Sequence, residues 1–202
     1  MPSRSEMWQR VQSSYDVVVV GGGICGCGIV RDLAERGISA VLLEQYDLAY
    51  GTSSRSSKLV HGGFRYLKQL RFGLVFESVS ERRILLKIAP HLVKPLAFLF
   101  PIYKSSPLSL WMLRLGLWLY DFLSLFRSPK LHKMIPKSKL SKVEPALRRD
   151  NLVGVPMYYD CSTDDARLTL ENAIDAAQDG ATILTWTKAE RFSWDEKKNS
   201  LR

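Results

Sequence analysis

A dense run of hydroxyl-bearing side chains lies just before a histidine and a pair of glycines. The run, Gly51–Lys58, offers five hydroxyls, two cations and many backbone donors. Such groups can surround phosphate oxygens without adding bulk. The pair Gly62–Gly63 permits a flat or bulky ligand to approach the backbone, and His61, Arg65 and Tyr66 place polar side chains beside it. These residues predict a site for an oxygen-rich ligand. The alternative, a solvated serine-rich linker, does not explain the apolar residues that follow.

An apolar strand that leads into a glycine turn precedes this run. Val17–Val20 is the predicted strand, and Gly21, Gly23 and Gly26 fit the dinucleotide-binding fingerprint. These glycines permit a tight turn, close approach of a pyrophosphate, and packing of the next helix on the strand. The predicted helix Ile24–Arg36 then points its free N–H groups and positive dipole end at the phosphates.

A carboxylate follows at the end of the next predicted strand. Ser39–Leu43 reads as a short buried strand, and Glu44 lies close to the offset expected for an acid that accepts from ribose hydroxyls. A carboxylate there disfavours a ligand with a 2′-phosphate, because the two anions would repel. Two alternatives remain, a glycine turn in another α/β protein and a NAD-binding Rossmann protein. The second is disfavoured because the polar run has no role in a simple nicotinamide fold.

The composition is that of a globular protein with an excess of positive charge. The 202 residues are 46% hydrophobic and 24% charged, with a net charge of +9. This charge favours an anionic partner, and without a nucleic-acid-binding motif we expect no nucleic acid. Cys25 and Cys27 lack metal-type spacing, so we predict no metal and interpret both as small packing residues. The polar residues 1–14 lack the apolar segment of a secretory signal, which predicts a cytoplasmic protein.

The middle of the chain contains two predicted helices. Leu74–Ile88 has amphipathic spacing, and its charged residues Glu77, Glu81, Arg82 and Arg83 are predicted to form a solvated face. A proline-punctuated apolar connector follows, through Phe98–Phe100.

The stretch Leu108–Phe126 is the most apolar of the chain. Arg114 and Asp121 in its middle argue against a membrane span. We favour a buried core helix over an interfacial one. The following segment, Arg127–Lys142, is basic and free of acids, so an anionic membrane surface would attract it.

The last part of the chain returns to the α/β pattern. A helix is predicted to begin at Thr163–Ala166 and to end at Gly180, with acids in its first turn. Ile183–Trp186 then reads as a strand, and Phe192–Trp194 as the first arm of a hairpin.

Several of these motifs together resemble one enzyme family. Gly51–Leu67, Glu81–Leu92 and Asp160–Leu168, together with the glycine turn, are similar to the FAD-dependent, quinone-linked glycerol-3-phosphate dehydrogenases. The likeness covers nearly the whole chain from Tyr15 onward and corresponds to the N-terminal portion of that family. It implies oxidation of sn-glycerol 3-phosphate to dihydroxyacetone phosphate, with electrons passing through FAD to a membrane quinone.

The resemblance also implies roles for individual residues. The two residues implied at the substrate pocket are Arg65 and Tyr66. No catalytic base is implied; His61 could be proposed, but we favour cofactor contact for it. The residues implied to contact FAD are Gly21, Gly23, Ile24, Cys25, Gly26, Glu44, Thr52, Ser53, Ser56, Lys58, Leu59, His61, Gly62 and Ala189.

The implied fold is α/β, a Rossmann-like FAD-binding fold of the glutathione-reductase-like type. Residues 1–14 are interpreted as a polar extension, 15–202 as the N-terminal part of the FAD-binding domain, and 92–156 as an insertion on the substrate side. Family members continue for hundreds of residues, so we expect the fold to be incomplete at the C-terminus. A fragment, a truncated product and a damaged reading frame are the alternatives, and the activity of the chain by itself stays open.

Further alternatives concern the activity, the partners and the location. An oxygen-using glycerol-3-phosphate oxidase and a non-catalytic module that binds nucleotide or membrane both remain open. The expected location is the cytoplasm, peripheral on the inner face of the cytoplasmic membrane. The oligomeric state stays open, a homodimer of the full-length parent being one alternative.

Overall fold

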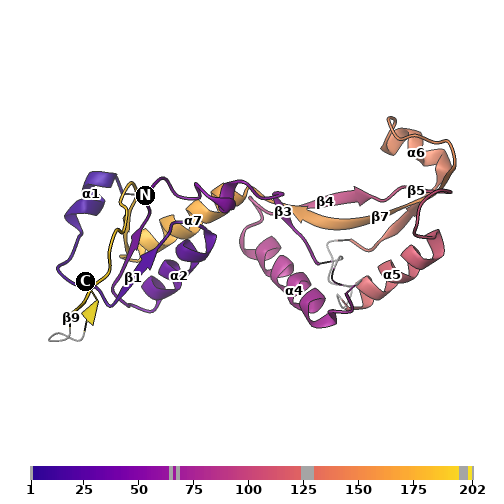
Figure 1. Cartoon of the computed structure of the whole chain (residues 1–202). Coiled ribbons are helices and arrows are strands. Elements are labelled where there is room, and N and C mark those ends of the chain that lie inside the picture. The colour runs from indigo at the N-terminus through magenta and orange to yellow at the C-terminus, as the bar shows by residue number, and fades with distance from the viewer. Residues whose placement is uncertain (1, 64–65, 67–68, 124–129, 196–199, 202) are drawn as a thin grey trace. The chain divides into compact units, whose positions relative to one another are not determined.

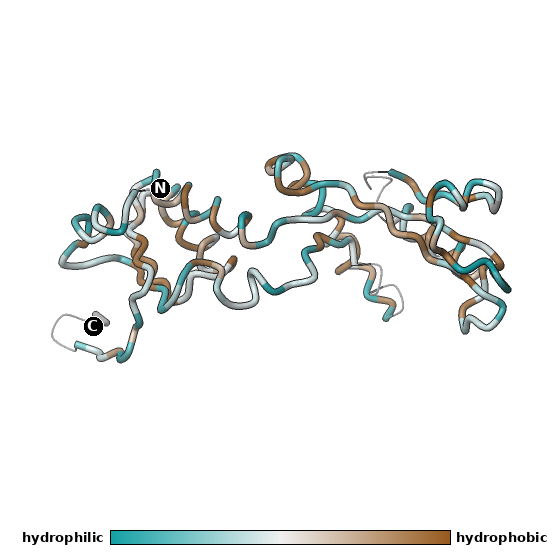
Figure 2. Tube along the Cα trace, turned by 90° about the horizontal axis from the view of Figure 1, so that it is seen from above, coloured by the Kyte–Doolittle hydropathy of each residue, from teal (hydrophilic) through white to brown (hydrophobic). Residues whose placement is uncertain are grey.

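The chain divides into two compact units (Figure 1). The first contains residues 1–57 and 164–202, and the second contains residues 58–163. In Figure 2, hydrophobic stretches separated by hydrophilic residues occur along the tube of both units, and each unit has buried apolar clusters of its own. The computed structural model describes residues 2–63, 66, 69–123, 130–195 and 200–201.

A three-stranded parallel sheet forms the centre of the first unit. Its strands β1 (Val17–Val20), β2 (Ala40–Leu43) and β8 (Thr182–Leu184) lie in the order β1-β2-β8. Val17 pairs with Ala40, and Val41 pairs with Thr182. The predicted parallel sheet is therefore present, with a third strand that enters from far along the sequence.

Two helices pack against each other beside this sheet. Helix α2 (Ile24–Glu35) ends just before Gly37, whose φ of +71° suits glycine. Helix α7 (Asp165–Gln178) begins at the cap residue Asp164, whose carboxylate accepts from the Arg167 N–H at 3.0 Å. The two helices bury small side chains against each other, among them Cys27 and Ala173. These helices confirm the expected α/β pattern.

Short elements complete the first unit. The N-terminal helix α1 (Arg4–Gln9) has a capping box from Ser3 to Glu6, and its Met7 is buried in the core of the unit. A 3₁₀ turn, η1 (Thr52–Ser54), follows β2. The strands β9 (Trp194–Asp195) and β10 (Ser200–Leu201) pair antiparallel, as the predicted hairpin requires. The N-terminal residues therefore contribute more than a polar extension.

The second unit is built around one long strand, β7 (Leu152–Ser162). Four shorter strands pair antiparallel with it. They are β3 (Leu59–Val60), β4 (Lys94–Leu99), β5 (Ile102–Tyr103) and β6 (Lys133–Ile135). The predicted apolar connector is thus wrong for residues 94–99, which form a strand along β7.

Helices cover part of this antiparallel sheet. Figure 1 shows α4 (Phe72–Ile88) and α5 (Leu110–Leu123) on the same face of it, and α6 (Lys137–Val143) follows β6. Helix α5 corrects the expectation of a core helix, because only one of its sides is buried. Leu113 and Leu117 are 3% and 1% exposed, whereas Trp111 and Phe122 are 66% and 63% exposed. Within the described residues, no helix is both long enough and apolar enough to cross a membrane.

Candidate functional site

The glycine turn between β1 and α2 has the backbone geometry that a dinucleotide-binding turn needs. Gly21 has a φ of +105°, a conformation that side chains disfavour. A Cβ on Gly26 would lie only 1.9 Å from the Gly21 carbonyl oxygen. Gly23 is the cap residue of α2 and has no side chain to satisfy the helix N–H groups. The turn therefore holds strand and helix in contact and leaves backbone donors at the helix start.

The polar run reaches this turn through Ser53. The Ser53 hydroxyl oxygen accepts from the Ile24 N–H at 2.9 Å, and a Cβ on Gly23 would lie 3.2 Å from the same oxygen. Thr52 and Cys25 are both exposed, on η1 and on the first turn of α2. The structure thus brings together Ser53, Gly23 and Ile24, three of the residues predicted to contact the cofactor.

Glu44 is fixed at the end of β2 by bonds to both of its carboxylate oxygens. Its Oε2 accepts from the Gly22 N–H at 2.7 Å, and its Oε1 accepts from the Tyr46 N–H at 2.8 Å. An ionised carboxylate has about four acceptor positions, so capacity for ribose hydroxyls remains. The Thr187 N–H donates to the Glu44 carbonyl at 2.8 Å, which places the segment leading to Ala189 beside Glu44.

Three other predicted cofactor residues have structural roles that the sequence did not indicate. The Ser56 hydroxyl donates to Asp165 Oδ2 at 2.6 Å and so ties the polar run to the start of α7. Lys58 has a φ of +55°, and its carbonyl accepts from the Thr163 N–H at 2.9 Å. Leu59 pairs with Ser162 in the second unit.

The His61–Gly63 turn follows β3 in the second unit. His61 is exposed, and its Nδ1 lies 3.2 Å from the Gly63 N–H and accepts from it. A neutral imidazole that accepts at Nδ1 carries its proton on Nε2, so Nε2 is a donor. The Tyr66 ring lies edge-on to His61, 6.5 Å between centroids. The structure therefore brings Tyr66 to this turn, while the predicted substrate residue Arg65 lies outside the described residues.

A buried polar network touches the same turn and corrects a prediction. Arg82, expected on a solvated face, is 1% exposed and pairs with the Asp160 carboxylate. Its Nη1 also donates to the Tyr120 hydroxyl at 3.0 Å. Local charge pattern could not reveal this pair, because Asp160 comes from β7 and Tyr120 from α5. The only sequence signals were the family-like motifs Glu81–Leu92 and Asp160–Leu168, which contain Arg82 and Asp160.

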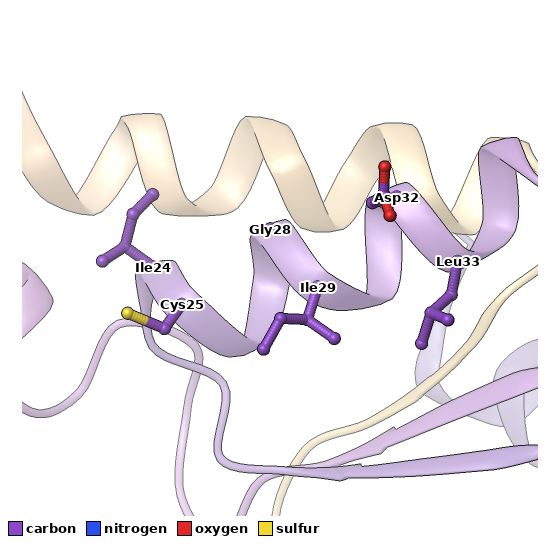
Figure 3. Close-up of a pocket in the computed structure, with 6 residues that line it drawn as sticks. All are labelled: Ile24, Cys25, Gly28, Ile29, Asp32 and Leu33. Atoms are coloured by element: carbon purple, nitrogen blue, oxygen red, sulfur yellow. The ribbon is translucent and has the colours of Figure 1, made fainter. Parts of the chain in front are cut away.

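A shallow hollow runs along α2 (Figure 3). Cys25, Ile29 and Leu33 project from one side of the helix in this view. Asp32, which also lines the hollow, is paired with Arg36 at 2.8 Å. The lining is mostly apolar and offers little chemistry. In the part of the chain that the structure describes, no cluster of His, Cys, Asp or Glu could hold a metal.

The exposed Cys25 and the buried Cys27 should differ sharply in thiol reactivity. Burial, aided by the charge of Glu44, raises the pKa of the Cys27 thiol to about 11, and burial also raises the pKa of Cys161. We expect a maleimide to label Cys25 alone in the folded protein at neutral pH, and all three cysteines after denaturation. Peptide mass spectrometry checks this, and fast labelling of Cys27 would contradict its buried position.

Because the neutral thiol is the favoured buried form, the contribution of Cys27 to stability should be lost as the pH rises through about 11.

Comparison with known proteins gives consistent matches. The family described as FAD dependent oxidoreductase matches residues 16–201. The aerobic glycerol-3-phosphate dehydrogenase of Staphylococcus epidermidis is 45% identical over 186 residues, which are 92% of this chain and 33% of that protein. The protein of the same name from Staphylococcus aureus is 42% identical over 184 residues, 91% of this chain and 33% of that one. This chain therefore spans about a third of the length of these relatives.

Solved structures also resemble the chain. The glycerol-3-phosphate dehydrogenase of Bacillus halodurans, solved with FAD, matches with a TM-score of 0.68 and 31% identity, over 98% of this chain and 34% of that one. The L-α-glycerophosphate oxidase of Mycoplasma pneumoniae, also with FAD bound, gives a TM-score of 0.65 at 19% identity, over 92% of this chain and 48% of that one. The second likeness is one of fold alone.

Proposed function

Because the chain belongs to the FAD dependent oxidoreductase family, we propose that it binds FAD and serves the oxidation of sn-glycerol 3-phosphate to dihydroxyacetone phosphate. The observation that carries this proposal is the glycine turn bonded to Glu44. Gly22 donates to the carboxylate, and the Gly26–Gly21 contact leaves no room for a side chain. The 45% identity to a named glycerol-3-phosphate dehydrogenase supports the substrate.

Each unit of this chain offers residues with chemistry suited to FAD. Glu44 would accept from the ribose hydroxyls, and the backbone donors at the start of α2 would face the pyrophosphate. The Nε2–H of His61 would donate to the flavin, which favours cofactor contact over the role of a general base. When bound, FAD supplies the hydride-accepting chemistry.

Arg65 and Tyr66 are proposed for the substrate side. A guanidinium can bind a phosphate dianion through two parallel N–H bonds, which suits Arg65 to the phosphate of glycerol 3-phosphate. Tyr66 supports this location through its contact with His61.

Quinone is the favoured electron acceptor. Three matches named dehydrogenases are 31–45% identical to this chain, whereas the oxidase is 19% identical and shares the fold alone. Release of peroxide during turnover would instead favour the oxygen-using alternative.

Replacing Glu44 by glutamine should weaken FAD binding about 10- to 100-fold, the loss expected for a hydrogen bond to a charged group. The amide keeps one acceptor oxygen but turns the other, which accepts from Gly22 or Tyr46, into a donor. The measurement is titration of the purified chain with FAD, followed by flavin fluorescence. Asp47→Asn is the matched control, because Asp47 accepts from the neighbouring Leu48 N–H at 2.8 Å and does not reach the turn.

This titration, followed by addition of substrate, distinguishes a catalytic chain from one that only binds nucleotide. Equal FAD affinity of Glu44→Gln and wild type would remove Glu44 from the site. Bleaching of bound flavin on anaerobic addition of glycerol 3-phosphate would support turnover. Flavin that stays oxidised would favour the non-catalytic, nucleotide-binding alternative.

We further propose a peripheral location on the inner face of the cytoplasmic membrane, through the exposed side of α5. Trp111, Leu115, Trp118 and Phe122 recur at helical spacing and are 54–66% exposed, while Leu117 on the other side is buried. Aromatic and aliphatic residues on one face of a helix suit the boundary between headgroups and acyl chains.

Vesicle binding tests the proposed contact between the exposed side of α5 and a membrane. The wild-type chain should co-sediment with vesicles of anionic phospholipid, and the double variant Leu115→Glu/Trp118→Ser should remain in the supernatant. Phe192→Ser is the control, because Phe192 is 53% exposed but belongs to the first unit. Equal sedimentation of wild type and double variant would exclude this face of α5.

A further inference from the structure

Arg82 is a buried charge that the proposed binding of FAD and substrate does not use directly. It lies on α4, is 1% exposed, and pairs with the Asp160 carboxylate of β7. The same Nη1 lies 3.0 Å from the Tyr120 hydroxyl oxygen and 3.2 Å from the Tyr159 carbonyl oxygen, so its two N–H groups are shared among three acceptors. A buried ion pair is often no more stabilising than apolar residues of similar volume. Its presence therefore calls for a role beyond stability.

This network contacts the His61–Gly63 turn from two sides. The Gly62 N–H donates to Asp160 Oδ1 at 2.8 Å. On the other side, a Cβ on Gly62 would lie 1.8 Å from the Tyr120 hydroxyl oxygen and 2.8 Å from Arg82 Nη1. The backbone of the turn therefore fills the space between the side chains of the network.

The backbone of the His61–Gly63 turn sets the orientation of the His61 ring. The Gly63 N–H donates to His61 Nδ1, and Gly63 has a φ of +71°. A shift of the Gly62 backbone would move this donor and release the imidazole from its tautomer. The side chains that hold Gly62 thereby act on His61 without touching it.

We propose that Arg82 is a positioning residue which, with Asp160 and Tyr120, fixes the His61–Gly63 turn so that His61 presents its Nε2–H to FAD. This inference rests on the proposed FAD binding. The planar guanidinium suits the task, because the directions of its N–H bonds are fixed, whereas the three N–H groups of an ammonium rotate; Nη1 meets Asp160, Tyr120 and Tyr159 together. Burial raises the pKa of Tyr120 well above its usual value, so its hydroxyl keeps its proton and stays neutral.

The test compares Arg82→Lys and Tyr120→Phe with Asp121→Asn. Asp121 is a matched control, because it is buried in the same unit, is the residue after Tyr120 on α5, and bonds His132 Nδ1 at 2.7 Å. Three quantities are measured for each full chain. They are amide hydrogen exchange at Gly62 relative to the β4–β7 amides, the Kd for FAD, and the visible circular dichroism of bound FAD.

The two network variants should raise exchange at Gly62 about tenfold relative to the β4–β7 amides, the effect of about one lost hydrogen bond. They should also raise the Kd for FAD by a similar factor and change the dichroism of the flavin. Asp121→Asn should leave the relative exchange and the dichroism as in wild type, even where it lowers the unfolding temperature.

Each contrary result has a separate meaning. Unchanged relative exchange at Gly62 in Tyr120→Phe and Arg82→Lys overturns the positioning role. Raised exchange at Gly62 with an unchanged Kd for FAD and an unchanged dichroism would mean that the network holds the turn but does not affect the flavin. That result overturns the proposed effect on FAD. If the wild-type chain binds no FAD, the proposed function fails, and the exchange measurement then decides whether the network holds the turn.

Discussion

Replacing Asp160 by alanine is expected to lower the free energy of unfolding by about 3–5 kcal/mol, the loss typical of breaking a buried ion pair. The change leaves the charge of Arg82 buried without the Asp160 carboxylate and removes the acceptor of the Gly62 N–H. Urea unfolding followed by far-ultraviolet circular dichroism measures this loss.

The ion pair of Arg31 with Asp175 provides the control for Asp160→Ala. Its side chains are 38% and 43% exposed, so water screens both charges. Asp175→Ala should therefore cost at most about 1 kcal/mol. Equal losses for the two variants would mean that burial does not govern the strength of these pairs.

Replacing Gly26 by alanine is the second change with a large expected effect. The new Cβ would lie 1.9 Å from the Gly21 carbonyl oxygen, and neither atom can rotate away, because the backbone fixes the positions of both. We expect a loss of about 3 kcal/mol in the free energy of unfolding, the upper range for overpacking, as strand and helix separate. FAD binding should weaken as well, because the same shift moves the N–H groups at the start of α2.

Gly28→Ala tests the same chemical change two residues further along α2. Apart from the chain neighbours and the backbone of α2 itself, no described atom lies within 4 Å of a Cβ built there, and alanine favours a helix over glycine by about 1 kcal/mol. This control should therefore be neutral or stabilising. If the Gly26→Ala variant unfolded at the same urea concentration as the wild type, the turn would accommodate the new methyl group without loss of unfolding free energy.

The α/β fold and the strand, glycine turn and helix of the candidate site could be predicted because their signals are local. The valine strand, the three spaced glycines and Glu44 lie within one βαβ unit, and likeness to solved FAD-binding flavoenzymes confirms the predicted fold class. Gly37 and Gly180 end helices at the expected places, both with positive φ.

The antiparallel unit escaped prediction because its signals are not local. Gly154 and Pro156 interrupt the alternation of apolar and polar residues along β7, and Pro95 argues against a strand at β4. The two strands nevertheless pair with each other. Arg82 looked like one member of an exposed charged cluster. Its partner Asp160 lies far along the chain, and no local spacing rule brings the two together.

Backbone hydrogen bonds hold the first and last residues of the second unit next to each other. Leu59 pairs with Ser162, and the Thr163 N–H donates to the Lys58 carbonyl at 2.9 Å. Once this unit has folded, the chain on either side leaves it from adjacent points, so β8 can reach β2 with little of the entropy loss of closing a long loop. During synthesis, the parallel sheet of the first unit can be completed only after residue 184 has been made. The folding order therefore places the inserted unit before the sheet that it interrupts, and it makes residues 58 and 163 natural points at which a short linker could replace the insertion.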